Sequence, residues 1–146
     1  MVPEELRQRT SEFADVVTEL VRPFLKSDDC GKATKQVLRA STAVASNYRA
    51  ACVARSPVEF ASTIGLVLQE ADECNYWLSY LLRHRFIKGA TAEEVADEAR
   101  QLAKIFGASF RTVKRNAAFW KRQHSRPSSA RRKGGRSYDS RSQNSQ

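Results

Sequence analysis

The sequence predicts an all-α protein that folds as an antiparallel, up-down-up-down four-helix bundle. Three observations lead to this fold class. Apolar side chains recur at steps of three and four in successive long segments, which places each set on one side of a helix. The connections between the segments are short, so neighbouring helices should be antiparallel. No segment alternates apolar and polar residues as a half-buried strand does.

The first helix is expected over residues 3–25. Pro3 suits a first turn, because the amide hydrogen that proline lacks has no helical partner there. Pro23 should weaken or kink the last turn, since it removes a donor. The expected apolar face is Leu6, Phe13, Val17, Leu20 and Phe24.

The second helix is expected over residues 32–55. Residues 40–46 are nearly all small, and small side chains let another helix backbone come close, so this segment should be a tightly packed central helix. Its apolar face is Val37, Ser41, Val44, Tyr48 and Ala51.

The third helix should begin at Ser56-Pro57 and continue to about residue 87. Ser56 can cap the helix, Pro57 fits its first position, and Glu59 can reach back to complete a capping box. Gly89 is expected in the left-handed position that ends it. The face is Phe60, Ile64, Val67, Ala71, Cys74, Leu78 and Leu81.

A second capping box, from Thr91 to Glu94, should start the fourth helix. This helix is acidic in its first turns and basic in its last, which complements the helix dipole. Its apolar face is Val95, Ala99, Leu102, Phe106, Ser109 and Val113. Residues 121–146 contain no Leu, Ile, Val, Phe or Trp, so we expect a bundle over residues 1–118 and a disordered Ser/Arg-rich tail over 119–146.

Charge is distributed very unevenly along the chain. The net charge is +9, but residues 1–99 hold 12 Lys and Arg against 15 acids, whereas residues 100–146 hold 13 Lys and Arg against one acid. A helix dipole explains part of this gradient but not its continuation into the tail. Such a positive field attracts polyanions, with RNA or DNA favoured over acidic proteins and anionic lipid; solubility alone is the alternative.

The predicted contact residues are the cations of the last helix and the tail, which would bind phosphates without reading base sequence. They are Arg100, Lys104, Arg111, Lys114, Arg115, Lys121, Arg122, Arg126, Arg131, Arg132, Lys133 and Arg136, with Arg141 extending the charge.

Enzymatic chemistry finds little support in the residues. A carboxylate-bridged metal site needs Glu-x-x-His steps, and no His follows Glu70 or Glu73 at that spacing. These two acids are expected to pair instead with Arg or Lys of neighbouring helices, with Arg9 and Arg49 as candidates. No glycine-rich phosphate loop and no nucleophile with a His partner are apparent, so we expect no catalytic residue, metal or cofactor.

Three dispersed cysteines and the lack of a signal peptide or membrane span predict a cytoplasmic protein without membrane contact. Tyr76 and Trp77 can stack on bases, although filling a helix interface is the favoured interpretation. A secondary stripe on the fourth helix (Ile105, Ala108 and Thr112), with Tyr76 and Tyr80 on the third, predicts self-association.

Several runs resemble the four-helix-bundle family of 23S rRNA intervening-sequence proteins. They are RASTAVASNYRAA over residues 39–51, with matches in residues 9–14, 54–60, 70–78 and 102–116. The resemblance covers about residues 7–118 and is specific for fold. The family is also similar to the accessory variability protein of diversity-generating retroelements, a positively charged pentameric barrel that works with a reverse transcriptase.

Taken together, these observations favour an oligomeric, non-enzymatic protein that binds RNA or DNA through its last helix and tail. The resemblance implies a homopentamer. The alternative function is a protein–protein adaptor, such as a reverse transcriptase accessory factor.

Overall fold

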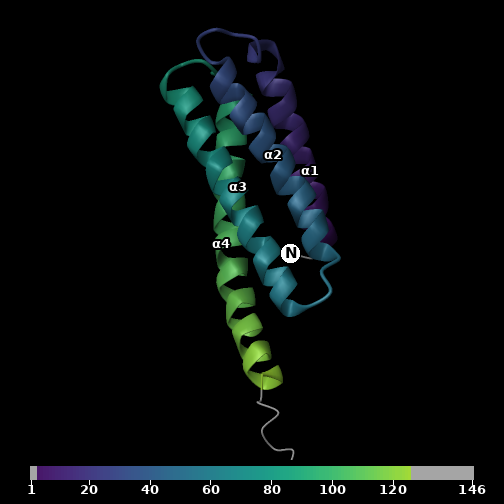
Figure 1. The fold of residues 1–146 in the computed structure, drawn as a ribbon. Coiled ribbons are helices and arrows are strands. Elements are labelled where there is room, and N and C mark those ends of the chain that lie inside the picture. Colours follow the sequence, from purple (N-terminus) through teal and green to yellow (C-terminus); the bar gives the residue numbers. More distant parts are fainter. Residues whose placement is uncertain (1–2, 126–146) are drawn as a thin grey trace, which may run out of the picture.

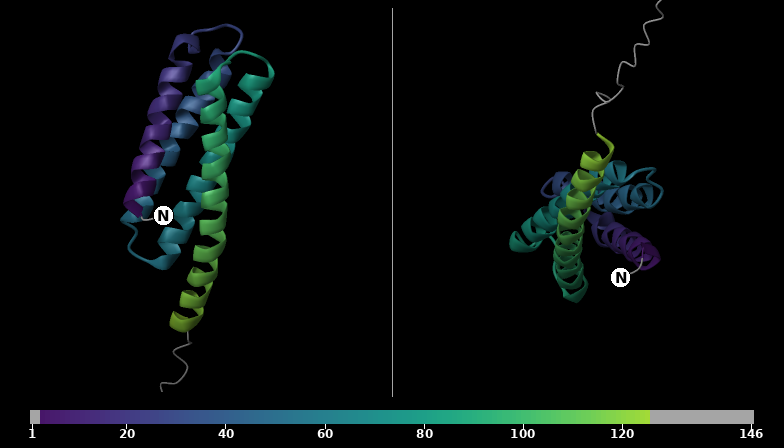
Figure 2. Two further views of the ribbon diagram at one scale, coloured as in Figure 1. Left: turned by 180° about the vertical axis from the view of Figure 1, so that it is seen from behind. Right: turned by 90° about the horizontal axis from the view of Figure 1, so that it is seen from below.

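The computed structural model describes residues 3–125 of the 146-residue chain. Its helices are α1 (Pro3–Val21), α2 (Gly31–Cys52), α3 (Pro57–Arg83) and α4 (Ala90–His124), with a 3₁₀ turn at Arg22–Phe24. Figure 1 shows that successive helices run in opposite directions, and the two views of Figure 2 agree. The predicted all-α four-helix bundle is confirmed, and no strand occurs within residues 3–125.

The predicted apolar faces meet in one continuous core. All five residues of the α2 face are buried, as are all of the α3 face except Phe60, which is half-buried. The largest fully buried side chains are Phe106, Ile64, Leu78, Leu81 and Leu102. Burying one such side chain stabilises the fold by roughly 1.5–3 kcal/mol, so this core orients the four helices.

The first helix ends at Val21 rather than at residue 25. Pro23 cannot donate a helical hydrogen bond, and the chain tightens into the 3₁₀ turn at that point. Gly31 then opens α2, where a Cβ atom would lie only 2.8 Å from the Leu25 carbonyl oxygen. Glycine is therefore needed where α2 leaves the connection.

The start of α3 follows the sequence prediction closely. Ser56 is the N-cap, its Oγ accepts a hydrogen bond from the Glu59 N–H at 3.1 Å, and Pro57 is the first helical residue. The Glu59 carboxylate accepts from the N–H of Arg55 at 2.9 Å, one residue before the cap. These bonds satisfy amide donors that the first turn would otherwise leave unpaired.

Two predictions at the junction of α3 and α4 are wrong. The third helix ends at Arg83, and its left-handed residue is Arg85, with φ 61°, rather than Gly89. The amides of Arg85 and Phe86 bond back to the helix's last carbonyls and close the turn before residue 89. Gly89, with φ 98°, is instead the N-cap of α4.

The predicted capping box at Thr91 does not form. Thr91 already lies inside α4, and no side chain caps this helix; the Gly89 carbonyl accepts the Glu93 N–H at 3.1 Å. The helix starts at Ala90 because the Gly89 carbonyl already accepts the first helical hydrogen bond, so Thr91 cannot be the N-cap.

At 35 residues, α4 is far longer than α1, which has 19. At 1.5 Å per residue the two helices measure about 52 and about 28 Å. The C-terminal end of α4 therefore projects beyond the α2–α3 connection, as Figure 1 shows. The predicted disordered tail over 119–146 begins inside this helix, so it is wrong for residues 119–124; residues 126–146 lie outside the described residues.

Candidate nucleic-acid interface

Seven cations of α4 share one face of the helix. At about 100° per residue they fall within an arc of about 120°, opposite the side chains of Leu102 and Phe106 in the core. We call this set the basic stripe. Its members, all exposed, are Arg100, Lys104, Arg111, Lys114, Arg115, Lys121 and Arg122.

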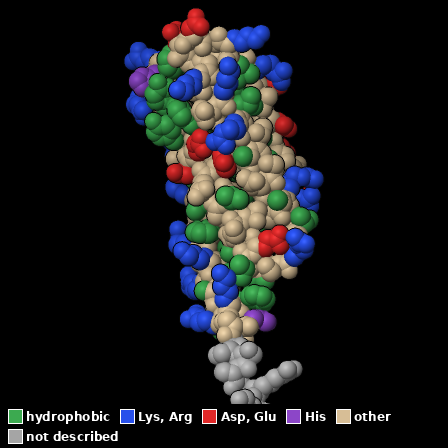
Figure 3. All heavy atoms as spheres, viewed as in Figure 1, with side chains coloured by type: hydrophobic (Ala, Val, Ile, Leu, Met, Phe, Trp, Pro, Cys, Tyr) green, Lys and Arg blue, Asp and Glu red, His purple; other side chains and the backbone are tan. Residues whose placement is uncertain are grey.

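The basic stripe extends along more than half of α4. Its first and last members are 22 residues apart, which corresponds to about 33 Å of helix. No Asp or Glu occurs between residues 99 and 125. On the face drawn in Figure 3, Lys and Arg side chains, and no acidic ones, cover the projecting end of the molecule.

The upper part of the stripe, Arg100 and Lys104, is partly neutralised. Arg100 Nη2 donates to Asp97 Oδ1 at 2.7 Å, and Gln101 donates to the other carboxylate oxygen at 2.6 Å. These bonds, with that of Arg100 the larger cause, lower the pKa of Asp97. Arg100 therefore already has an anionic partner, and it contributes less to an external anion than its position suggests.

The lower part of the stripe, from Arg111 to Arg122, has no such anionic partner within residues 3–125. The Arg111 guanidinium lies along the helix surface beside Gly107, and Lys114 Nζ lies 5.7 Å from the centroid of the Phe110 ring. Within residues 3–125, neither of these cations nor Arg115 forms an ion pair.

Lys121 and Arg122 continue the stripe on the last described turns and likewise form no ion pair with residues 3–125. An exposed row of like charges on a rigid helix can be neutralised by the phosphates of a nucleic acid, which release their condensed counterions on binding. The remaining predicted contact residues, Arg126, Arg131, Arg132, Lys133 and Arg136, lie outside the described residues.

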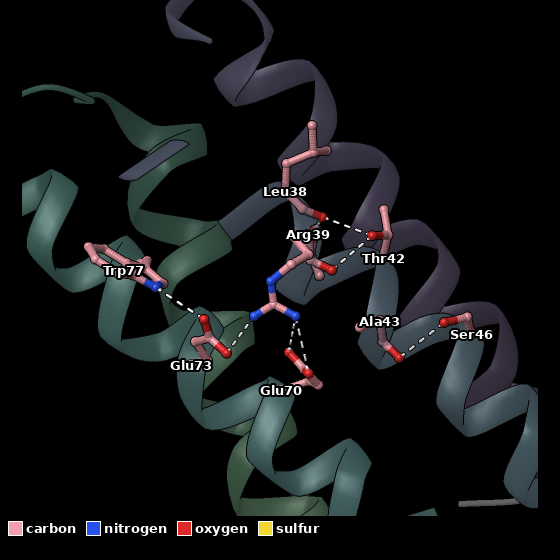
Figure 4. Close-up of polar contacts among 9 residues, drawn as sticks. Leu38, Arg39, Thr42, Ala43, Ser46, Glu70, Glu73 and Trp77 are labelled. Carbon is pink, nitrogen blue, oxygen red and sulfur yellow. Dashed lines mark hydrogen bonds and ion pairs between the residues drawn. The ribbon is translucent and has the colours of Figure 1, made fainter. Parts of the chain in front are cut away.

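Two other cations of the bundle, Arg39 and Arg9, link neighbouring helices. Arg39 of α2 bridges both acids of α3: its Nη1 donates to Glu70 Oε2 at 3.2 Å and its Nη2 to Glu73 Oε2 at 2.7 Å (Figure 4). The prediction that these acids pair with an Arg or Lys of a neighbouring helix is confirmed, but the partner is Arg39 rather than the candidates Arg9 and Arg49. Arg39 lowers the pKa of Glu73, and the two carboxylates raise the pKa of Arg39.

Arg9 has another partner on α4. Its Nη2 donates to Glu98 Oε2 at 3.0 Å and to Gln101 at 3.1 Å, which ties α1 to the upper half of α4. The hydrogen bonds to Glu98 raise the pKa of Arg9. The spacing of apolar residues in the sequence does not predict these partners, because it determines which side of each helix is buried but not how far one helix is shifted along another.

An apolar groove separates the lower half of α4 from the start of α1 and the end of α2. Tyr48, Phe60 and Val113 contribute to its walls, with Pro3 at the start of α1. Burial raises the pKa of Tyr48 to about 12, so its hydroxyl adds no charge to the groove.

The predicted secondary stripe lies beside this groove. Ala108 and Thr112 line it and are exposed, while Ile105 is half-buried. Sequence analysis missed two exposed aromatics on the projecting end, Phe119 (59 % exposed) and Trp120 (37 %). They were assigned to the tail because the helix was expected to end before them.

Among the described residues, no group of three or more His, Cys, Asp or Glu side chains is placed to hold a metal ion. None of the helices in residues 3–125 has the length and apolar character needed to cross a membrane.

Comparison with known proteins matches residues 4–108 to a family model described as 23S rRNA-intervening sequence protein. A solved structure from Bacteroides thetaiotaomicron VPI-5482, a protein of unknown function from the S23 ribosomal protein family, is similar to the chain. It is 26 % identical with a TM-score of 0.65, over 72 % of this chain and 97 % of its own. None of the curated proteins compared is significantly similar. The family match ends before Arg111, so the lower part of the basic stripe lies beyond it.

Proposed function

The chain belongs to the 23S rRNA-intervening sequence protein family, and from this premise we propose that it is a non-enzymatic nucleic-acid-binding protein. The basic stripe of α4 contacts the phosphates of RNA or DNA, and the cations that follow residue 125 add to the same field. Binding depends on charge and shape rather than on base sequence, because the stripe consists of phosphate-binding side chains on a single exposed helix face.

One observation carries this proposal: the lower part of the stripe presents cations at helical spacing with no acid between residues 99 and 125. Arg111, Lys114 and Arg115 lie well before the last turn of α4. The helix dipole favours cations only within about the last turn, so it accounts for Lys121 and Arg122 but not for these three. A solvated face needs only polarity, and α1 and α3 mix acids and cations, although α2 also carries cations without acids.

Self-association is part of the proposal. Phe119 and Trp120 project from the bundle on a helix whose neighbouring groove is apolar, and burying them against another copy would remove that surface from water. A homopentamer is the assembly implied by the sequence resemblance. Several stripes on one assembly would raise avidity by ~10²–10⁴ if one nucleic acid can reach them together.

The same groove favours a second candidate function, a protein–protein adaptor, for example for a reverse transcriptase. It is lined by Tyr48, Phe60 and Val113, and side chains of this kind are typical of helix-binding grooves. Under this alternative the oligomer persists, but nucleic acid is not the primary ligand. All three cysteines are free, as in a reducing compartment, so we propose a cytoplasmic location for either function.

The test is binding of labelled RNA and DNA oligonucleotides by the full chain and by a chain ending at Ser125, at low ionic strength. Affinity that persists in the shorter chain would assign binding to residues 1–125, which include the basic stripe. Complete loss of affinity would assign binding to the segment beyond residue 125. If neither chain binds any oligonucleotide, the adaptor function is favoured. Light scattering on the same samples measures self-association, which a mass of one chain at micromolar concentration would reject.

A further inference from the structure

A row of aromatic rings follows α3 to its C-terminal end and into the turn beyond it. Tyr76 and Trp77 lie 4.9 Å apart between ring centroids, and Trp77 and Tyr80 lie 5.7 Å apart. The row continues from Tyr80 to His84 at 4.5 Å and from His84 to Phe86 at 6.2 Å. Tyr76 is 57 % exposed, and at the other end of the row His84 is exposed and Phe86 is half-buried, so rings at both ends are accessible to another ring.

The row is held in place by the ion pair described above. Trp77 Nε1 donates to Glu73 Oε1 at 3.4 Å, and the other oxygen of Glu73 is bound by Arg39 from α2 (Figure 4). Trp77 and Tyr80 are half-buried and pack against the core, whereas Tyr76 is more exposed. A ring fixed in this way is organised before a ligand arrives, which reduces the ordering cost of binding.

The C-terminal end of the row is cationic, whereas the acids Asp72 and Glu73 precede its start at Tyr76. The Arg83 guanidinium lies 5.9 Å from the centroid of the Tyr80 ring, and Arg85 and Lys88 follow in the turn. No acid occurs between Glu73 and Glu93. Figure 3 shows His, Lys and Arg side chains gathered beside hydrophobic ones at the upper end of the molecule, where α3 ends.

Arg85 occupies a position that favours glycine. Its φ is 61°, and it is the one non-glycine residue with positive φ among residues 3–125. Its N–H donates to the Leu82 carbonyl and the Phe86 N–H to the Leu81 carbonyl, each at 3.0 Å, which is the hydrogen-bond pattern of a left-handed helix end. A strained arginine beside exposed rings suggests that its charge has a function there.

We propose that this aromatic patch (Tyr76, Trp77, Tyr80, His84 and Phe86, with Arg83 and Arg85) stacks the unpaired bases of a single-stranded nucleic acid. Every base has a π face, so stacking on such rings requires no particular sequence, and guanidinium groups can bind the adjoining phosphates or stack on bases. A duplex keeps its bases paired and stacked internally, so it gains nothing from the patch.

This inference rests on the proposed function and adds a base-binding site at the opposite end of the bundle from the lower basic stripe. The two sites have different chemistry. The stripe binds phosphates of either strand form, whereas the patch distinguishes single strands from duplexes.

The test compares a 12-nucleotide single-stranded RNA with an RNA duplex of 12 base pairs, using fluorescence anisotropy on the full chain at fixed salt. In the variant carrying Tyr76→Leu and Tyr80→Leu, single-strand affinity should fall by roughly 5- to 150-fold for each base lost from the stack. Duplex affinity should stay within about twofold, because the phosphate contacts of α4 remain. A single-stranded DNA of the same sequence shows whether the sugar contributes.

Arg85→Gly guards against misfolding as an explanation, since glycine accepts the left-handed backbone more readily than arginine. This variant should melt no lower than the natural chain, and yet it should bind the single strand more weakly. Leu66→Ala, at an exposed apolar side chain of α3 outside the patch, is the matched control and should not change the preference for single strands.

A spectroscopic readout reports on the patch directly. With Trp120→Phe, Trp77 becomes the sole tryptophan, and its emission should change on adding the single strand but not the duplex. The inference is overturned if oligonucleotides bind but the tyrosine variant keeps the full single-strand affinity; binding of phosphates by α4 then still stands. It is also overturned if the tyrosine variant loses only self-association in light scattering, which would make the patch a subunit interface. Absence of all oligonucleotide binding would instead reject the proposed function itself.

Discussion

The charged side chains of α4 have different partners in its upper half (residues 90–107) and its lower half (residues 108–124). In the upper half, Glu98 binds Arg9 of α1, and Arg100 binds Asp97 one turn away. In the lower half, Arg111, Lys114 and Arg115 have no acid partner within residues 3–125. The same helix therefore serves as a packed member of the bundle at one end and as an exposed cationic rod at the other.

This difference indicates which charges are available to a ligand. A cation that already holds a carboxylate must lose that contact before it binds a phosphate, whereas an unpaired cation must lose only water and counterions. The upper half should therefore determine stability, and the lower half should determine binding.

The largest expected effect comes from the core of the upper half. Phe106 is completely buried and lies 5.4 Å from the Tyr48 ring between centroids, so Phe106→Ala should lower the free energy of unfolding by about 3–5 kcal/mol. Phe119→Ala is the matched change in the lower half, where the ring is 59 % exposed, and should cost within about 0.5 kcal/mol. Urea denaturation measures both; equal losses would contradict the division of α4.

The next effect is on binding and belongs to the lower half. Duplex affinity falls with roughly the 0.9 power of salt concentration for each phosphate contact, so at 0.1 M salt each contact contributes about eightfold to the affinity. The double variant Arg111→Gln, Arg115→Gln should therefore bind an RNA duplex about 60-fold more weakly.

The matched control for this double variant is Lys32→Gln with Lys35→Gln. It removes the same charge from exposed cations in the first turns of α2 that form no ion pair within residues 3–125. The duplex affinity of the control should fall by much less. The melting temperatures of the two double variants should show that both are folded. Equal losses of affinity would mean that net charge, and not the stripe, governs binding.

A smaller effect is expected at the ion pair between α2 and α3. Arg39 is half exposed, so its contacts with Glu70 and Glu73 are screened by solvent. Arg39→Met keeps the aliphatic stem and leaves the two carboxylates uncompensated, which should cost about 1 kcal/mol. Chemical denaturation checks this value, and the duplex affinity should be unchanged.

The smallest effect concerns pH. Arg39 lowers the pKa of Glu73 in the folded state, so ionised Glu73 stabilises the fold above its unfolded pKa of about 4.3, and that contribution is lost as pH falls below it. Glu73→Gln should therefore lose less stability than the natural chain between about pH 5 and pH 3, by a few tenths of a kcal/mol. Thermal melts across this range measure the difference; identical curves would remove Glu73 as a source.

Much of this fold was predictable because the buried face of each helix depends on the spacing of residues that are close together in the sequence. The α2 face and most of the α3 face follow from apolar spacing, and the start of α3 follows from Ser56 and Pro57. The junction of α3 and α4 was not predictable in the same way. Its left-handed residue is Arg85, and the rule that glycine takes this position pointed to Gly89 instead.

The candidate sites were predictable only in part. The basic stripe follows from helical spacing, since residue number fixes position around a single helix. The partner of Glu70 and Glu73 depends on how far one helix is shifted along another, which side-chain packing sets. The aromatic patch joins α3 to the turn after it, so no single periodic pattern shows it.

The most direct test of the central claim is the salt dependence of duplex binding by the full chain. Five unpaired cations on the lower stripe predict that the logarithm of affinity falls steeply with the logarithm of salt concentration, with a slope of magnitude about 3 or more. A slope near zero, or no binding at low ionic strength, would contradict the account.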